Sequence, residues 1–463
     1  MMFQSLAGLS RVHFVGIGGS GMSGIAEVLL DYDLEVSGCD QAASEATDRL
    51  VQLGVKVCFG HSADHLEGVD LVVKSSAVSE DNVEIQAARE RGITVARRSE
   101  MLGELMRLKY GIAVAGTHGK TTTTSMVGAI LTETGLDPTV IVGGRLRVSG
   151  TGARLGKSDY LVAEADEYDR SFLRLAPILA VITSIDTDHL DTYGDLATIQ
   201  QAFVQFADRV PFFGRAIVCL DDSNIQAILP SLKDRRVFTY GLTPQADLTA
   251  VAIEAHSSGS RFTVRSHEKG DLGVIELPML GLHNVANALA ATSVGLALGL
   301  PLADIARALA SFGGVHRRFE QIGQWRGATV VDDYAHHPTE LAATLAAARQ
   351  SCPKGKIHAV FQPHLFSRTR DHAEAFGRAL LAADRAVVTG VYASREQPLE
   401  GVSGELIVTA AKASGHHHVS YCPEWRDAPA LLSKSVEPGD LVLTLGAGDV
   451  YRLSRELAAG SHP

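Results

Sequence analysis

The sequence predicts an α/β protein in which a parallel sheet is built three times along the chain. Short apolar runs alternate with helix-like stretches, and strands that alternate with helices form parallel sheets. The runs open with RVHFVG at 11–16, KYGIAVAG at 109–116 and ATVVDDYA at 328–335. At roughly 150 residues per domain, the 463 residues fit three domains, which we expect at 1–107, 108–313 and 314–463.

The first domain is expected to bind a nucleotide diphosphate. GIGGSG at 16–21 follows a strand and opens a helix, the context in which G-x-G-x-x-G binds dinucleotides. Gly16 permits the tight turn, Gly18 lets a diphosphate approach the backbone, and Gly21 lets helix and strand pack closely. Asp40 ends the next strand, where a ribose hydroxyl is held. These residues alone favour NAD without excluding another nucleotide diphosphate or a turn that is merely rich in glycine.

The central domain opens with a candidate phosphate loop. GTHGKTT at 116–122 fails the pattern G-x-x-x-x-G-K-[ST], because Val114 occupies its first position. It still supplies glycines for backbone freedom, a lysine for β- and γ-phosphates and a hydroxyl for Mg²⁺. We therefore expect nucleotide contacts from Gly116, Thr117, His118, Gly119, Lys120, Thr121 and Thr122. A Thr-rich helix start without a ligand is the alternative.

Further strands of this domain end in acidic segments. EADEYD at 164–169 and SIDTDHLDTYGD at 184–195 follow apolar runs, and carboxylates at strand ends suit Mg²⁺. His189 lies among the aspartates of the second segment, where a metal or phosphate role and a structural role are equally open. Three alternating runs between 248 and 279 lack intervening helices and predict a small antiparallel ribbon.

The third domain repeats the pattern of strand followed by polar residues. VVDDYAHHPTE at 330–340 carries Asp332, Asp333, His336 and His337 before a helix that starts near Pro338. FQPHLFSRTRD at 361–371 adds His364, Arg368 and Arg370; an arginine there could clamp a phosphate or carboxylate, or form a surface ion pair. HHH at 416–418 is expected to be a solvated turn, with metal binding as a weak alternative.

Composition limits the partners. The formal net charge is −11, which argues against nucleic acid or an anionic membrane as the main partner. The start of the chain lacks a signal-peptide layout and no run of 18 apolar residues occurs, so we expect a cytoplasmic protein. The five cysteines (Cys39, Cys58, Cys219, Cys352, Cys422) form no C-x-x-C pair and are expected to be buried or spare thiols, not a disulfide frame or a zinc site.

Taken together and in order, these motifs resemble the Mur ligase family over nearly the whole chain. Beyond the segments above, GLHNVANALAA at 281–291, GVHRRFE at 314–320 and TLGAGDVY at 444–451 resemble family signatures. The resemblance implies three domains: a Rossmann-like one, a P-loop-type ATPase and a second Rossmann-like one. It implies that the first domain binds the UDP of UDP-N-acetylmuramate instead of NAD, through Gly16, Gly18, Gly19, Ser20, Gly21 and Asp40.

The resemblance also assigns roles at the ATP site. Lys120 would contact the phosphates, Thr121 and Glu164 would hold one Mg²⁺, and His189 a second. Asn284 and Asn287 lie in the segment similar to the adenine contact, and Arg317 in the one that brings an arginine near the γ-phosphate. Asp333, His336, His364 and Arg368 match segments that meet the phosphates and the incoming amino acid. The implied catalytic residues are thus Lys120, Arg317, His336, His364 and Arg368.

The activity implied is ATP-dependent joining of L-alanine to the muramyl carboxylate through an acyl phosphate, by a monomer or weak homodimer. The nearest alternative is a recycling enzyme that adds a tripeptide to the same UDP-sugar, and a distant one is an NAD-dependent oxidoreductase fused to an NTPase module. The chain has no lysine between Thr192 and Cys219, which counts against family members that carry a carbamylated lysine. Leu365 stands where some relatives have an arginine, which puts one substrate contact in doubt.

Overall fold

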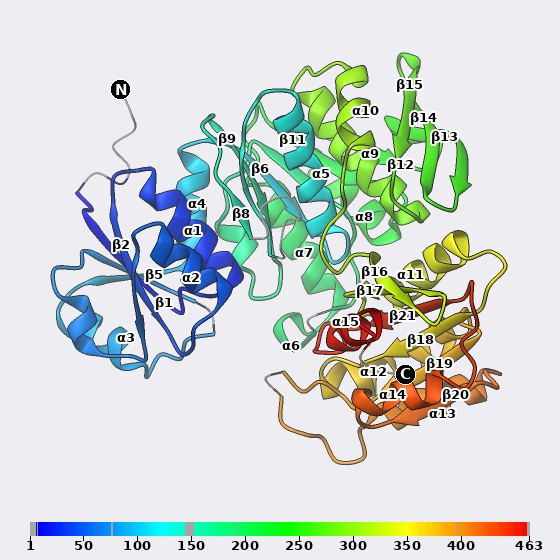
Figure 1. Cartoon of the computed structure of the whole chain (residues 1–463). Helices are drawn as coiled ribbons and strands as arrows, with labels where there is room; N and C mark the ends of the chain where they lie inside the picture. The colour runs from blue at the N-terminus through cyan, green and yellow to red at the C-terminus, as the bar shows by residue number, and fades with distance from the viewer. Residues whose placement is uncertain are drawn as a thin grey trace. The chain divides into compact units, whose positions relative to one another are not determined.

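The computed structural model describes residues 6, 8–75, 77–143, 152–188, 190–394 and 396–460. It contains three sheets, each with helices packed on it, as Figure 1 shows. Contacts between residues divide the chain into two compact units, which we describe separately. The first comprises 1–252, 262–275 and 286–313, and the second 253–261, 276–285 and 314–463.

The first sheet is parallel throughout, with strand order β3-β2-β1-β4-β5. Its strands are β1 (Arg11–Val15), β2 (Glu35–Asp40), β3 (Lys56–Phe59), β4 (Leu71–Lys74) and β5 (Thr94–Arg97). The connecting helices are α1 (Ser20–Leu30), α2 (Glu45–Gln52), the 3-10 turn η2 (Ala63–Leu66), α3 (Val83–Glu90) and α4 (Arg98–Arg107). β2 and β3 lie on one side of β1, and β4 and β5 lie on the other. The strand order therefore switches at β1, whose carboxyl end leads into the turn before α1. The Rossmann-like prediction for this part is confirmed.

The second sheet has ten strands in the order β15-β14-β13-β12-β11-β10-β6-β9-β7-β8. They are β6 (Tyr110–Ala115), β7 (Thr139–Ile141), β8 (Ala153–Arg154), β9 (Tyr160–Glu164), β10 (Leu179–Ile182), β11 (Arg215–Cys219), β12 (Val237–Gly241), β13 (Leu248–His256), β14 (Gly259–Ser266) and β15 (Gly270–Leu277). β6 lies between β10 and β9 and pairs parallel with both. β13, β14 and β15 are consecutive neighbours without helices between them, as the predicted ribbon requires.

The helices around this sheet are α5 (Lys120–Glu133), η3 (Ser171–Arg174), α6 (Leu190–Tyr193), α7 (Leu196–Ala207), α8 (Ser223–Ile228), η4 (Leu229–Leu232), α9 (Leu282–Ala297) and α10 (Leu302–Ala310). β6 is buried at Gly111 through Ala115, as expected for a central strand covered on both faces. The loop that follows β6 therefore starts from a rigid position in the sheet.

The third sheet has the order β16-β17-β21-β18-β19-β20, in which only β16 runs antiparallel. Its strands are β16 (Glu320–Trp325), β17 (Ala328–Asp333), β18 (Ile357–Phe361), β19 (Arg385–Thr389), β20 (Val419–Cys422) and β21 (Leu441–Leu445). Its helices are α11 (Pro338–Ser351), α12 (Phe366–Leu380), α13 (Gly404–Ala413), η5 (Trp425–Asp427), α14 (Ala428–Leu432) and α15 (Tyr451–Ala458). Alternate strand residues enter separate cores on the two faces, Val331 and Phe361 in one and Val330 and Val360 in the other.

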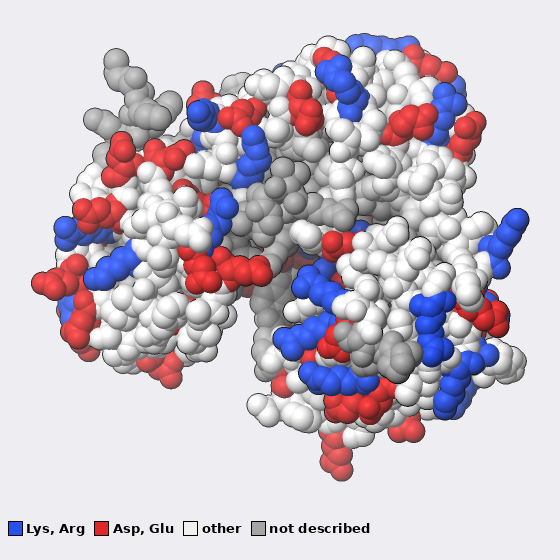
Figure 2. Space-filling model, viewed as in Figure 1, with Lys and Arg blue, Asp and Glu red and all other residues white. Residues whose placement is uncertain are grey.

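Three composition-based expectations have structural outcomes. All five cysteines are free, and four of them are buried. Within the described ranges, no helix combines the length and apolar character needed to cross a membrane. HHH at 416–418 does form a turn, but His416 is buried and not solvated as expected. Basic and acidic side chains are interspersed on the face of the N-terminal part seen in Figure 2.

Candidate active site

The phosphate loop connects β6 to α5 and depends on two glycines. Gly116 has φ +133° and Gly119 has φ +81°, both in the region that favours glycine. A Cβ on Gly116 would lie 2.1 Å from Thr183 Oγ1, and one on Gly119 would lie 2.6 Å from Asn287 Oδ1. Glycine is therefore required at both positions, because the backbone is in a conformation that favours glycine and because a Cβ would clash with a neighbouring side chain.

The segment after β10 holds the loop in shape. Thr117 N donates to Ser184 O at 3.0 Å, and His118 N donates to Ser184 Oγ at 2.9 Å. Asp186 N donates to Thr117 Oγ1 at 2.9 Å, and its carboxylate lies 3.1 Å from His118 Nε2. Thr117 and His118, both expected to contact nucleotide, thus also fix the loop against the neighbouring strand.

The N-terminus of α5 has the properties of an anion site. The helix starts at Lys120 and spans 14 residues, and no side chain caps its first turn. The first amides of a helix lack partners within the helix and carry the positive end of its dipole. Such a turn binds phosphate readily, so the residues present fit the phosphate chain of a nucleotide.

Lys120 points its ammonium at the carboxylate of Glu167, for which the sequence alone predicted no individual role. Its Nζ lies 2.8 Å from Glu167 Oε2 and donates to Gly116 O at 2.7 Å. Burial by itself lowers the pKa of Lys120, but the carboxylates of Glu167, Asp166 and Glu164 outweigh burial and raise it. Burial raises the pKa of Glu167 to about 7, against the opposing effect of Lys120. Lys120 therefore stays charged inside the loop.

The two residues predicted to share one Mg²⁺ lie together. Thr121 Oγ1 donates to Glu164 Oε2 at 3.0 Å, and Gly143 N donates to the same oxygen at 2.8 Å. A hydroxyl and a carboxylate are the hard oxygen donors that Mg²⁺ prefers, so these residues fit the ion. Thr122 is buried in the same turn. His189, predicted for a second metal, lies outside the described residues.

The two asparagines predicted for the adenine lie on the first turns of α9 and are buried. Asn287 Oδ1 accepts from Thr123 Oγ1 at 3.2 Å and faces Gly119. The structure thus brings Asn287 against the phosphate loop. Asn284 Nδ2 donates to Leu280 O at 2.8 Å at the start of the helix.

The glycine turn of the first domain is tied to the strand beside it. Gly16 has φ +82°, and Gly19 precedes α1 as its N-cap. Gly18 N donates to Asp40 Oδ2 at 2.8 Å, so Asp40, expected to hold a ribose hydroxyl, also anchors the turn. Ser20 begins α1, and its side chain lies outside the described part of the structure.

A Cβ on Gly21 would lie 2.3 Å from Arg98 Nη1, so the small size of this residue admits a guanidinium. Its expected role in packing the helix against the strand stays a prediction. Strand and turn are in close contact at Gly38, where a Cβ would lie 2.5 Å from Ile17 Cδ1. Arg98 lines a pocket together with Lys74 and Arg97. Arg97 and Arg98 are adjacent in the sequence, but no local pattern links them to Lys74 on β4, so the sequence alone did not indicate this group of cations.

In the third domain, Asp333 is a buried acceptor at the end of β17. It accepts from Phe319 N at 2.7 Å and Ala335 N at 2.8 Å, and from Thr344 Oγ1 at 3.2 Å. Burial raises the pKa of Asp333 to about 6, although Arg318 and the amides oppose this effect. The carboxylate therefore organises the turn between β17 and α11.

Arg317 is held by several partners. Its Nε donates to Asp332 Oδ2 at 3.0 Å and its Nη2 donates to Gly446 O at 2.6 Å. The guanidinium carbon lies 4.9 Å from the centre of the Tyr334 ring and 4.7 Å from that of Tyr451. In this arrangement Arg317 joins β17 to the segment after β21, so an approach to a γ-phosphate would require it to exchange these partners.

His336, His364 and Arg368 are brought together as the sequence suggested. The rings of His336 and His364 have centroids 5.8 Å apart, and Arg368 Nη1 lies 3.3 Å from His364 Nδ1. His336 Nδ1 lies 3.0 Å from Tyr334 O and 3.2 Å from Glu340 Oε2. Arg368 is buried, whereas Arg370 pairs with Asp371 at the surface.

Leu365 separates His364 from the helix that carries Arg368. It is the N-cap of α12 with φ +70°, its side chain is buried, and its N donates to Tyr392 O at 3.0 Å. Tyr392 stacks on His364, with ring centroids 5.9 Å apart. His337, also noted in the sequence, is buried and its ring meets that of His372.

Comparison with known proteins adds an independent line of support. Three family models match consecutive parts of the chain: the Mur ligase family catalytic domain at 11–110, the Mur ligase middle domain at 114–295 and the Mur ligase glutamate ligase domain at 317–448. The matches span most of each sheet and include the candidate residues of all three.

Curated relatives and solved structures agree with these matches. The chain is 50% identical to a UDP-N-acetylmuramate–L-alanine ligase of Desulfosudis oleivorans (97% of this chain, 98% of the relative) and 51% identical to one of Salinibacter ruber (97% and 94%). The crystal structure of the UDP-N-acetylmuramate-alanine ligase of Thermotoga maritima has a TM-score of 0.81 at 30% identity (97% and 99% covered). A murein peptide ligase of Psychrobacter arcticus has a TM-score of 0.69 at 25% identity (97% and 98% covered).

Proposed function

The chain belongs to the Mur ligase family, and we propose that it joins L-alanine to the muramyl carboxylate of UDP-N-acetylmuramate with ATP, in peptidoglycan precursor synthesis. The observation that carries the ATP-dependent chemistry is the uncapped start of α5, where Lys120, Thr121 and Glu164 converge. The choice of acceptor and amino acid is supported by relatives of that name at about half identity over nearly the full length.

In this proposal the amides at the start of α5 and the Lys120 ammonium bind the phosphate chain. Glu167 keeps Lys120 charged and directed into the loop. Phosphoryl transfer depends mainly on positioning and on neutralising negative charge. Lys120 and the helix terminus supply both without forming a covalent bond to substrate.

Thr121 and Glu164 would hold Mg²⁺ through the hydroxyl and a carboxylate oxygen. The ion, when bound, would neutralise charge on the phosphate oxygens. The hydrogen bond between Thr121 and Glu164 orients both groups toward one point before the metal binds. It therefore reduces the conformational entropy that metal binding would cost.

The reaction has two steps. A muramyl carboxylate oxygen attacks the γ-phosphorus, giving an acyl phosphate and ADP; the amine of L-alanine then attacks the acyl carbon, and phosphate leaves. We propose that His336 accepts the proton that the amine loses. Its Nδ1 is engaged by Tyr334 O and Glu340, which leaves Nε2 for a proton.

We propose that the UDP-sugar binds at the turn from Gly16 to Gly21 and at Asp40. The cations of the adjoining pocket, Lys74, Arg97 and Arg98, would contact it as well. Lysine and arginine neutralise a diphosphate, and arginine binds it in a bidentate manner. We also propose the domain limits 1–107, 108–313 and 314–463, which the three family matches support. The cytoplasmic location stays a prediction that cell fractionation can test. The monomeric or weakly dimeric state stays a prediction that light scattering can test.

Phosphate release with ATP, UDP-N-acetylmuramate and one amino donor tests the function. L-alanine should release phosphate only when the UDP-sugar is present. Release with L-alanyl-γ-D-glutamyl-meso-diaminopimelate and none with L-alanine would replace the proposal with the peptide-adding activity that the Psychrobacter arcticus relative's name describes. A change in the fluorescence of a reduced nicotinamide dinucleotide when the protein is added would instead indicate that the first domain binds a dinucleotide.

A further inference from the structure

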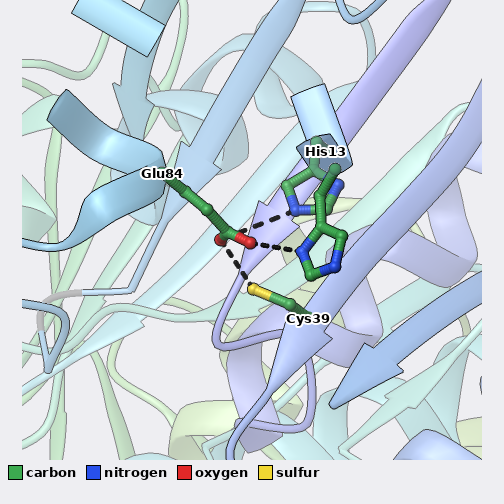
Figure 3. Close-up of side chains that lie close together, drawn as sticks. His13, Cys39 and Glu84 are labelled. Carbon is green, nitrogen blue, oxygen red and sulfur yellow. Dashed lines mark hydrogen bonds and ion pairs between the residues drawn. The ribbon is translucent and has the colours of Figure 1, made fainter. Parts of the chain in front are cut away.

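A second cluster of ligand-type side chains lies in the first domain, apart from the ATP-binding residues. His13 is on β1, Cys39 on β2, His65 in η2 and Glu84 on α3. One ligand atom of each lies within 4.8 Å of those of the other three. Figure 3 shows His13, Cys39 and Glu84 pointing toward one another from separate elements.

The contacts within the cluster centre on the Glu84 carboxylate. Oε2 lies 2.8 Å from Cys39 Sγ and 3.8 Å from His13 Nε2, and Oε1 lies 2.5 Å from His65 Nδ1. His61 borders the group, with Nδ1 3.2 Å from Cys39 Sγ. Zinc bonds of 2.0–2.3 Å in a tetrahedron place ligand atoms about 3.3–3.8 Å apart, so small side-chain shifts would convert these contacts into a coordination sphere.

His13 supplies an independent observation, a buried ring nitrogen without a hydrogen-bond partner. The side chain is 1% exposed, and its Nε2 is buried without a hydrogen-bond partner. Its Nδ1 lies 2.9 Å from Ser37 Oγ. When Nδ1–H donates to that hydroxyl, Nε2 carries a lone pair aimed at the cluster. Histidine ligands in proteins are oriented in the same way, by a partner on the other ring nitrogen.

Glu84 is a buried carboxylate whose basic neighbours are all histidines. It is fully buried, and among the described residues the basic side chains near its carboxylate are those of His13, His61 and His65, at 3.8, 3.4 and 2.5 Å, with no lysine or arginine. Buried charges in proteins are paired or bind metal ions. A divalent cation would neutralise Glu84 and satisfy His13 Nε2 in one step.

We propose that His13, Cys39, His65 and Glu84 bind one Zn²⁺ as a structural site of the UDP-sugar domain. Imidazole, thiolate and carboxylate are all zinc ligands, and four protein ligands without an open position are typical of structural sites. The lack of a C-x-x-C pair in the sequence argued against a zinc site; here each ligand comes from a different element, a spacing that no short motif describes.

Binding would remove one proton from Cys39. The thiol now donates to Glu84; on binding, the proton goes to solvent and the sulfur–metal bond replaces the hydrogen bond. The ion would then link β1, β2, η2 and α3. Because Asp40 follows Cys39 directly and holds Gly18 N, the site would stiffen the strand end that positions the glycine turn.

Cobalt(II) binding to the untagged full-length protein tests the proposal. The chain is stripped with a chelator, saturated with Mg²⁺ to fill oxygen-donor sites, and titrated with Co²⁺ and then Zn²⁺. We expect one equivalent of Co²⁺ to give a thiolate-to-cobalt absorption band that Zn²⁺ abolishes. Cys39→Ser should lose the band, and Cys58→Ser should keep it, since Cys58 lies in register with Cys39 on the neighbouring strand and outside the cluster.

Two further variants make the result independent of the folding of Cys39→Ser. Ser37→Ala keeps every ligand and removes only the partner of His13 Nδ1, so it should weaken Zn²⁺ binding by about 10-fold to 100-fold. His13→Gln should weaken it at least as much. Absence of the band in the unmodified protein, its persistence in Cys39→Ser, or its loss in Cys58→Ser would each overturn the proposal. Because no readout uses ligase activity, failure here leaves the proposed function untouched.

Discussion

Lys120 and Glu167, 47 residues apart, form an ion pair with Nζ and Oε2 separated by 2.8 Å inside the phosphate loop. Both side chains are largely buried, at 13% and 3% exposure. In this structure the Glu167 carboxylate contacts the Lys120 ammonium. The oxygens of a bound phosphate would compete with Glu167 for that ammonium. The lysine that should neutralise the nucleotide is kept charged by a carboxylate that does not need to touch the nucleotide.

Lys120→Ala should abolish ADP formation and also destabilise the protein. Removing one partner of a buried pair leaves the other uncompensated, which costs about 3–5 kcal/mol. Lys120→Ala/Glu167→Gln should recover most of that stability in urea denaturation while staying inactive. Turnover by either variant would rule out the phosphate-loop role of Lys120.

Thr121→Val should raise the Mg²⁺ concentration needed for half-maximal activity by about 10-fold or more, because it removes the hydroxyl bonded to Glu164. Thr121→Ser keeps the hydroxyl and should restore the original requirement. Thr122→Val addresses whether the neighbouring threonine shares this work, and its Mg²⁺ dependence should match that of the unmodified protein. Equal Mg²⁺ curves for Thr121→Val and Thr121→Ser would remove Thr121 from the metal site.

Gly119→Ala should lower ATP affinity and stability together. Alanine in the left-handed region costs about 1–2 kcal/mol, and its Cβ would also lie 2.6 Å from Asn287 Oδ1. Gly135→Ala is the matched control, since Gly135 has φ +80° with nothing within 4 Å of a Cβ. Both should lose stability in urea denaturation, Gly119→Ala at least as much as Gly135→Ala because of its added contact with Asn287, and only Gly119→Ala should weaken ATP binding in calorimetry.

Asp333 should give a distinctive pH dependence of stability. Its pKa is about 6 in the folded protein and about 3.9 when unfolded, so the folded state binds the proton more tightly. Its contribution is fully present below pH 4 and is lost as the pH rises through 6, on the order of 2–3 kcal/mol. The unfolding free energy of the unmodified protein should therefore fall relative to Asp333→Asn between pH 4 and 7. A difference that is flat over this range would contradict the assignment.

Strands with several consecutive apolar residues were predictable from the sequence. RVHFV and YGIAVA become β1 and β6, since most of their residues are apolar and buried, as expected for strands covered on both faces. β3 and β5 were not identified. Each has four residues and a partly exposed burial pattern at the edge of its sheet, so neither shows a long apolar run or a sustained alternation.

The candidate site shows the same division between local and long-range information. The glycines, Lys120 and Thr121 lie close together in one loop, so a few consecutive residues are enough to predict phosphate and Mg²⁺ binding there. Glu167 and Asn287 reach that loop from other elements, and pairings of this kind depend on the tertiary fold. Gly21 is a further example: the motif located it, but Arg98, which its small size admits, comes from α4.

Leu365 shows how one residue can resist replacement for two opposed reasons. Its φ of +70° is a conformation that favours glycine, and holding a leucine there costs about 1–3 kcal/mol. Glycine would remove that strain but also the buried side chain that seats the start of α12. A change to glycine therefore cannot both keep the packing and relieve the strain, so the placement of Arg368 beside His364 depends on this bend. Substitutions intended to alter the surroundings of these two residues are better made beside the bend than in it.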